Sequence, residues 1–220
     1  MIELVIFDLD GTLIKLPVRY DFLRNELRDK FSIQGELFLI PMILERTKDN
    51  NTVKNEAFEL ICKEECNAID GLEVYEGAIE VIKEIHSKNK KIALVTLQCE
   101  RAANQILEIM GIRDLFLNIF TRDDYTDRSE QIIKTMREFN ITADKTMMIG
   151  DRINDFESAE KVGCKSIIIR RGNQDGNDKM NWVKDNIELK KEIQKILLII
   201  YQLYLFGLLR INCFCFDRSE

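Results

Sequence analysis

A chain of 220 residues, 45% of them hydrophobic, is long enough for one globular domain with a sizeable insertion. Its formal net charge of −6 argues against nucleic acid as the main partner, because contacts with a phosphate backbone need a basic face. No signal peptide is expected, since Glu3 interrupts the first apolar run, and we therefore expect a cytoplasmic protein with no membrane partner.

The first predicted element is a short buried strand, because Val5, Ile6 and Phe7 are β-branched or aromatic in a run too short for a helix. Asp8 and Asp10 follow directly, and alternation along an extended chain points both side chains the same way. Two neighbouring carboxylates repel each other, and one of them resists ionisation unless a cation lies between them. The pair therefore predicts a bound cation.

The chain from about residue 17 to residue 70 is predicted to be helical, without a convincing strand. After it, helices predicted at 76–89, 100–112, 129–141 and 155–163 alternate with strands predicted at 91–96, 117–121, 146–151 and 165–170. Ser129 is expected to cap the third of these helices, and Gly163 to end the fourth. The alternation predicts an α/β fold, in which a parallel sheet with helices on both faces carries an all-helical insertion after its first strand.

The C-terminal segment Ile196–Leu209 is apolar nearly all round. It is shorter than the roughly 20 residues that span a bilayer, so packing on the core or on another subunit is the preferred interpretation. A homo-oligomer formed through this tail is one prediction, and the alternatives are a membrane contact, which the short length disfavours, and a tail without function. The predicted division is a core of residues 1–16 and 74–190, a helical cap of 17–73, and an apolar tail of 191–220 whose role the sequence does not define.

Polar residues stand at three predicted strand ends, which is where open parallel sheets bind their ligands. Asp8 and Asp10 end the first strand, Thr96 ends another, and Asp151 ends a third, with Asp155 four residues further on. Four carboxylates at one sheet edge need Mg²⁺ or a similar hard cation to offset their repulsion. Thr96 also precedes a helix, whose first amides form a natural phosphate site.

Simpler explanations exist for each of these motifs. Asp10-Gly11 also suits an ordinary turn, Asn154 also suits a helix cap, and Thr96 also suits the end of any strand. The sequence contains no glycine-rich nucleotide-binding motif, and the first motif does not fit a calcium-binding EF-hand loop.

The cysteines and the single histidine give no sign of a metal site. Cys62 and Cys66 are one helical turn apart, and Cys213 and Cys215 alternate on a predicted strand. Neither pair has partners at zinc-site spacing, so both are interpreted as structural. His86 is expected on a helix surface.

Taken together, these residues resemble the haloacid dehalogenase superfamily, chiefly its phosphatases. The D-x-D-G-T motif matches Asp8 to Thr12, the strand-end Ser or Thr matches Thr96, and G-D-x-x-x-D matches Gly150 to Asp155. The resemblance covers about residues 1–172. It implies a Rossmann-like core with a helical cap after the first strand, and a phosphoglycolate phosphatase-like enzyme.

The third motif departs from the family pattern, which usually has a lysine upstream of the fourth motif. Arg128 is the nearest cation here, whereas Lys134 stands too far into the next predicted helix to be the first choice. Arginine can bind phosphate oxygens through its planar guanidinium, although it is not equivalent to lysine. The alternative is that Arg128 is an ordinary exposed residue.

The resemblance implies a role for each site residue. Asp8 would attack phosphorus and form an aspartyl phosphate, while Asp10 would act as general acid and then as general base. The implied ligands of Mg²⁺ are Asp8, the main-chain carbonyl of Asp10, Asp151 and Asp155, and the implied phosphate contacts are Thr96, Leu97 and Arg128.

The predicted function is therefore Mg²⁺-dependent hydrolysis of a small phosphorylated metabolite. The general acid Asp10 favours phosphoryl transfer over halide displacement, which needs no proton. Arg19 and Arg46 could meet an anionic leaving group, although surface solubility explains them equally well. Two alternatives stay open, a phosphomutase on the same core and a non-catalytic binding or assembly protein with this fold.

Overall fold

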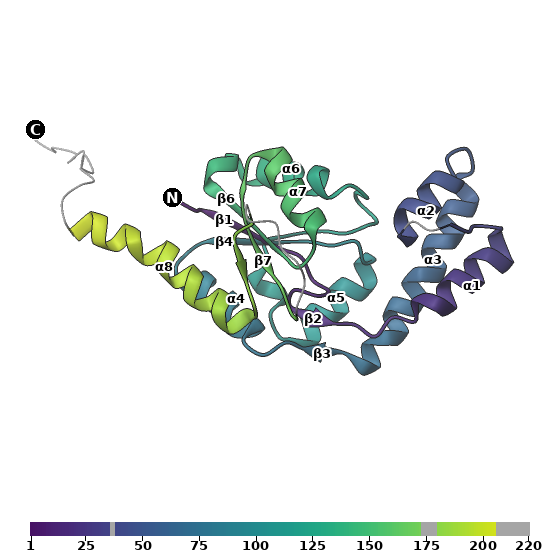
Figure 1. Ribbon diagram of the computed structural model, residues 1–220, viewed down its shortest axis with the longest axis horizontal. Helices are drawn as coiled ribbons and strands as arrows, with labels where there is room; N and C mark the ends of the chain where they lie inside the picture. Colours follow the sequence, from purple (N-terminus) through teal and green to yellow (C-terminus); the bar gives the residue numbers. More distant parts are fainter. Residues whose placement is uncertain (36–37, 173–179, 206–220) are drawn as a thin grey trace, which may run out of the picture.

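The computed structural model describes residues 1–35, 38–172 and 180–205, with side-chain surroundings as far as Ile196. Its centre is a six-stranded sheet in the order β5-β4-β1-β6-β7-β8, in which every neighbouring pair is parallel (Figure 1). The strands are β1 (Leu4–Phe7), β4 (Lys91–Val95), β5 (Asn118–Phe120), β6 (Thr146–Gly150), β7 (Lys165–Ile169) and β8 (Trp182–Val183). The predicted α/β fold with a parallel sheet is confirmed.

Helices cover both faces of this sheet. The helices are α4 (Ala78–Ser87), α5 (Glu100–Ile109), α6 (Arg128–Phe139), α7 (Ile153–Val162) and α8 (Asn186–Leu205). Side chains of α4, α5 and the first half of α8 pack on one face, against Val5, Phe7 and their neighbours. Side chains of α6 and α7 pack on the other, against Leu4 and Ile6. Alternate residues of β1 thus enter opposite cores, which is why the whole strand is apolar.

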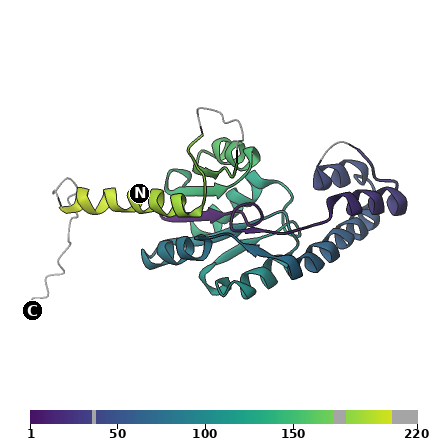
Figure 2. The ribbon, with the colours of Figure 1, turned by 60° about the horizontal axis from the view of Figure 1, so that its bottom comes forward.

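The helical insertion follows β1 and lies at one end of the molecule, away from the projecting end of α8 (Figures 1 and 2). It consists of α1 (Tyr20–Phe31), α2 (Leu39–Arg46) and α3 (Asn51–Ala68), which bury a small core of their own that includes Leu23, Leu27 and Ile61. Two short strands, β2 (Ile14–Lys15) and β3 (Glu73–Val74), form an antiparallel pair. They pair the segment that leads into the insertion with the segment that leads back to the sheet.

Local details differ from the sequence predictions at a few points. Asp127, rather than Ser129, caps α6, since its carboxylate accepts from the Glu130 amide at 2.8 Å. The two-residue strands β2, β3 and β8 were not predicted, because strands this short have no periodic pattern to detect. Gly163 does end α7 in the left-handed conformation, and His86 is exposed on α4 as expected.

The apolar tail is only partly described. Helix α8 continues to Leu205 and so crosses the predicted boundary between residues 190 and 191. None of the described helices is long and apolar enough to cross a lipid bilayer. Residues 206–220, with the predicted pair Cys213 and Cys215, lie outside the described residues. The domain boundaries and the homo-oligomer stay predictions.

Candidate active site

Three strand ends meet at one edge of the sheet because β1 lies between β4 and β6. Phe7, the last residue of β1, is in register with Leu94 on one side and with Ile149 on the other. The amide of the next residue, Asp8, donates to the Ile149 carbonyl oxygen at 2.9 Å. Asp8 therefore lies level with the ends of both neighbouring strands. The residues after these three strands are brought together by the order of the strands alone.

Three carboxylates from two of these strand ends form a tight cluster. Oxygen atoms of Asp8, Asp151 and Asp155 all lie within 4.8 Å of one another. Asp8 and Asp155 are buried, with 6% and 2% of their surfaces exposed, and Oδ1 of Asp151 is buried without a hydrogen-bond partner among the described residues. Such an unpartnered oxygen is costly unless something else binds it.

Gly11 is what allows Asp151 to come so close to the first motif. Its φ of +86° is left-handed, and a Cβ placed on it would clash with the Asp151 carboxylate. Arg171 fixes the same turn, because its guanidinium donates to the carbonyl oxygen of Gly11 and, at 3.0 Å, to that of Thr12. Any larger residue at position 11 would therefore push Asp151 away from Asp8.

Arg128 places one cation against this cluster. Its Nη2 donates to Oδ1 of Asp8 at 2.5 Å, and its Nε lies 3.0 Å from Oδ1 of Asp155. Its Nη1 donates to the carbonyl oxygen of Val95 at the end of β4. Arg128 is buried, so it is not an ordinary exposed residue, and Lys134 instead lies over the ring of Tyr125, 5.1 Å from its centroid.

Asp10, Thr96 and Leu97 lie beside the cluster without joining it. Oδ1 of Asp10 accepts from the Leu16 amide at 2.9 Å, and its carboxylate is not among the three that gather. Thr96 is buried, and its hydroxyl oxygen accepts from the Gln98 amide at 3.2 Å. The Leu97 carbonyl oxygen accepts from Arg122 at 2.6 Å.

Burial dominates the protonation of these carboxylates. It raises the pKa of Asp8 to about 8, with Arg128 opposing the shift and Asp155 adding to it. It raises the pKa of Asp151 to about 6, again with Asp155 adding to it. The pKa of Asp10 is also raised by burial, with the hydrogen bond from the Leu16 amide opposing the shift.

The cluster fits a small hard divalent cation. Its donors are all carboxylate oxygens, one of them is buried without a partner, and Arg128 alone leaves an excess of negative charge. A bound cation would satisfy the unpartnered oxygen of Asp151 and favour the ionised form of Asp8.

Sequence reasoning missed three residues around this site. Gln131 holds the loop after β4 in place, since its side-chain amide donates to the Thr96 carbonyl at 2.8 Å. The Asp10 carboxylate contributes to the raised pKa values of Tyr20 and Arg152, after burial for Tyr20 and after Asp151, Asp8 and Tyr20 for Arg152. The Arg152 guanidinium lies 6.0 Å from the ring centroid of Phe38, at the start of α2. For Arg152, the only signal in the sequence was its place within the Gly150–Asp155 motif.

Comparisons with known proteins agree with this geometry. A family model described as haloacid dehalogenase-like hydrolase matches residues 35–169, a range that begins after the Asp8 motif. Pyrophosphatase PpaX of Halalkalibacterium halodurans is 28% identical over 101 residues, which are 44% of this chain and 47% of that protein, so the chain spans about half of this relative. A phosphoglycolate phosphatase of Vibrio parahaemolyticus is 24% identical over 199 residues, covering 80% of this chain and 86% of that protein.

A solved structure shows the same fold. The crystal structure of a predicted phosphatase from Clostridium acetobutylicum has a TM-score of 0.69 at 23% identity, covering 89% of this chain and 99% of that one. The match to the family model confirms the resemblance that the motifs predicted.

Proposed function

The chain belongs to the haloacid dehalogenase-like hydrolase family, and from this premise we propose that it is a Mg²⁺-dependent phosphatase acting on a small phosphorylated metabolite. The observation that carries the proposal is the cluster of Asp8, Asp151 and Asp155, of which Asp8 and Asp155 are buried, with Arg128 against it. A structural role alone gives no reason to gather three carboxylates, two of them buried, because their mutual repulsion and desolvation destabilise the fold.

Asp8 is the nucleophile of the proposed reaction. One of its oxygens is held by Arg128, and the other lies 3.5 Å from the Thr12 hydroxyl, so the carboxylate has a fixed orientation. Attack on phosphorus forms an aspartyl phosphate and breaks the bond to the leaving oxygen. Arg128 and Thr96 contact the phosphoryl oxygens and stabilise the charge that develops there.

Asp10 is the general acid. Burial raises its pKa above the usual range of an aspartate, and in the proposed step its proton passes to the leaving oxygen as the ester bond breaks. Asp10 then accepts a proton from the water that hydrolyses the aspartyl phosphate. Mg²⁺ held by Asp8, Asp151, Asp155 and the main-chain carbonyl of Asp10 would supply positive charge that offsets the repulsion between carboxylate and phosphate.

The leaving group is proposed to be anionic, and Arg152 is its proposed contact. The cited relatives act, by their names, on pyrophosphate and phosphoglycolate, which both carry a second negative group. Arg19 does not suit this role, because its Nε and Nη2 both donate to Glu64 at 2.7 Å. Arg152 follows Asp151 directly, interacts electrostatically with Asp151 and Asp8, and lies 6.0 Å from the ring centroid of Phe38 in the insertion, so its charge is near both the carboxylates and the insertion.

The proposed function is tested by measuring phosphate release from phosphoglycolate, pyrophosphate and an aryl phosphate, with Mg²⁺ and with a chelator. We expect release from at least one of the three that requires Mg²⁺. A protein that releases no phosphate from these or from a wider panel of phosphate esters would instead be the non-catalytic binding protein.

Mg²⁺ is expected to stabilise the protein more at pH 8 than at pH 5. The folded chain holds a proton on Asp8 up to about pH 8 and on Asp151 up to about pH 6, whereas the unfolded chain releases both near pH 4. The stability of the metal-free protein therefore falls as the pH rises from 4 to 8. Mg²⁺ binds the ionised carboxylates, so its effect grows over the same range.

The measurement is the thermal midpoint with and without Mg²⁺ at each pH. A metal at a hundredfold excess over its Kd should raise the midpoint by about 5–10 °C at pH 8 and by clearly less at pH 5. Asp151→Asn should lose most of this shift, whereas Asp49→Asn, at an exposed position, should keep it. An equal shift at both pH values would contradict the assignment of the metal to this cluster.

Arg152→Ala is expected to raise KM about tenfold for phosphoglycolate and pyrophosphate, since it removes one charge-assisted contact. Its kcat/KM for an aryl phosphate, which has no second anionic group, should change by less than about threefold. The control is Arg137→Ala, which removes an exposed arginine of α6. Equal losses on all three substrates would show that Arg152 maintains the structure of the site and does not bind the leaving group.

A further inference from the structure

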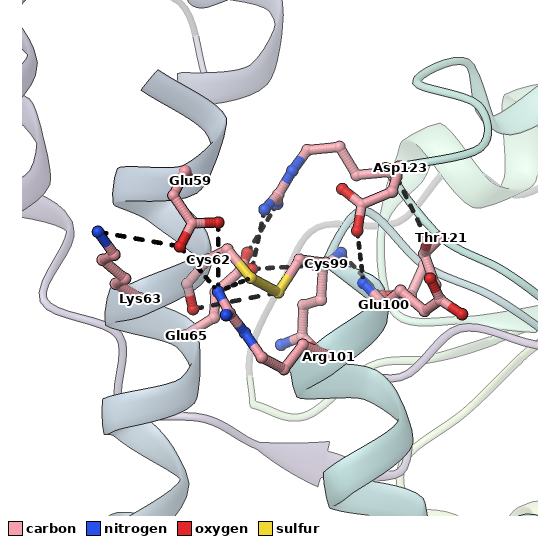
Figure 3. Close-up of a disulfide and its surroundings, with 12 residues drawn as sticks. Glu59, Cys62, Lys63, Glu65, Cys99, Glu100, Arg101, Thr121 and Asp123 are labelled. Carbon is pink, nitrogen blue, oxygen red and sulfur yellow. Dashed lines mark hydrogen bonds and ion pairs between the residues drawn. A yellow bond between two sulfur atoms is a disulfide. The ribbon is translucent and has the colours of Figure 1, made fainter. Parts of the chain in front are cut away.

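Three cysteines gather where α3 of the helical insertion meets the start of α5, and Figure 3 shows two of them, Cys62 and Cys99. Cys62 and Cys99 form a disulfide, with Cα atoms 5.5 Å apart. The Sγ atoms of Cys62, Cys66 and Cys99 all lie within 4.8 Å of one another. Cys66 is free and partly exposed, whereas the bonded pair is buried. A free thiol that solvent can reach thus lies next to a buried disulfide.

The disulfide joins the insertion to the loop that carries Thr96. Cys62 lies on α3, and Cys99 is the N-cap residue of α5, three positions after Thr96. Glu65 crosses the same junction, because it accepts from the Cys99 amide at 3.0 Å and from Nη1 of Arg122 at 2.8 Å (Figure 3). These non-covalent contacts place the two sulfur atoms near each other whether or not they are bonded.

The surroundings favour thiolates, which are the reactive form of cysteine. Nη2 of Arg101 lies 3.1 Å from Sγ of Cys62, and Cys99 stands at the N-terminus of a helix. A nearby guanidinium and a helix N-terminus both stabilise a thiolate. A cleft of about 550 Å³ between α3 and residues 122–126 has Cys62 in its lining. Cys66 does not line this cleft, and a reagent reaches its thiol through its own partly exposed surface.

We propose that Cys62, Cys66 and Cys99 form a thiol–disulfide exchange site for small disulfides, which fastens α3 to the Thr96 loop when it is oxidised. The Cys66 thiolate attacks the reagent disulfide, forming a mixed disulfide and releasing one reagent thiol. Cys99 attacks the Cys66 sulfur and releases the second reagent thiol. Cys62 then attacks Cys99, which leaves the Cys62–Cys99 bond and a free Cys66 thiol.

The steps balance, because two protein thiols lose two electrons and two protons to one reagent disulfide, which becomes two thiols. The reverse sequence reduces the protein.

The site is independent of the proposed phosphatase chemistry, because none of its three sulfur atoms belongs to the carboxylate cluster. Oxidation ties together residues 37 positions apart, so we expect the oxidised protein to melt about 5–10 °C above the reduced protein.

The test equilibrates the full chain with a series of ratios of reduced to oxidised glutathione. Samples are quenched with acid and alkylated, and the peptide that links Cys62 to Cys99 is quantified by mass spectrometry. We expect this peptide to form and disappear reversibly. Cys66→Ser should slow both directions by at least about tenfold. Cys164→Ser is the matched control, because it removes the other free cysteine of the described residues, which is buried on the opposite side of the sheet.

Three results would overturn the proposal. The first is that Cys62 and Cys99 stay open to alkylation at every ratio of reduced to oxidised glutathione. The second is that the linked peptide forms at the wild-type rate in Cys66→Ser. The third is a protein isolated with zinc on the three thiols that forms no disulfide, which would make the cluster a metal site.

Discussion

Replacing Asp8 with asparagine is expected to abolish phosphate release, lowering kcat by at least about 10³-fold, or on the order of 4 kcal/mol of barrier. Asparagine has nearly the shape of aspartate, but its neutral amide oxygen is a far weaker nucleophile towards phosphorus. Asp8 is buried at the centre of the sheet edge, and Arg128 fixes one of its oxygens. No other described carboxylate occupies that position in the strand register.

The same variant should fold at least as well as the wild type without metal. Burial raises the pKa of Asp8 to about 8, so the ionised carboxylate destabilises the metal-free fold, and a neutral amide removes this effect. The thermal midpoint at pH 8 separates loss of chemistry from loss of folding. Asp49→Asn, on an exposed loop, should match the wild type in both measurements. An Asp8→Asn protein with activity within tenfold of the wild type would show that another group attacks phosphorus.

The acidic part of the site was predictable because it depends on strand ends. Short apolar runs identify the strands, and parallel strands place the residues that follow them at one edge. Asp8 and Asp151 could therefore be assigned to one place from their positions after such runs. The order of the strands does not follow from the runs themselves, because it depends on how the connecting helices pack on the two faces. Only the structure shows that β1 lies between β4 and β6.

The residues that sequence reasoning missed act across long separations in the chain. Cys62 was considered with Cys66, its neighbour one turn away, but it is bonded to Cys99, which is 37 residues distant. Arg152 lies within a recognised motif, yet the spacing of that motif does not say whether its side chain turns towards the site or towards solvent. Tyr20 begins α1, and its approach to Asp10 depends on how the whole insertion is placed. Such contacts follow from packing rather than from local pattern.

Arg128→Ala is expected to impair both stability and catalysis. The substitution leaves two buried carboxylates, Asp8 and Asp155, without their cation, and breaking a buried ion pair in this way costs about 3–5 kcal/mol. The thermal midpoint of the metal-free protein should therefore fall by about 10 °C or more. Loss of a positioned donor to the phosphoryl oxygens should also lower kcat by about 10²–10³-fold. Saturating Mg²⁺ should restore part of the stability but little of kcat.

Two further variants decide which cation serves the site. Arg128→Lys keeps the charge, but one ammonium cannot reproduce the separate contacts with Asp8, Asp155 and Val95, so its kcat should lie between those of the wild type and Arg128→Ala. Lys134→Ala should stay within about twofold of the wild type, because the Lys134 ammonium lies over the Tyr125 ring rather than against the carboxylate cluster. The opposite order, with Lys134→Ala inactive and Arg128→Ala active, would assign the role of the family's third-motif lysine to Lys134. It would also mean that α6 shifts when substrate binds, since Arg128 occupies that position in this structure.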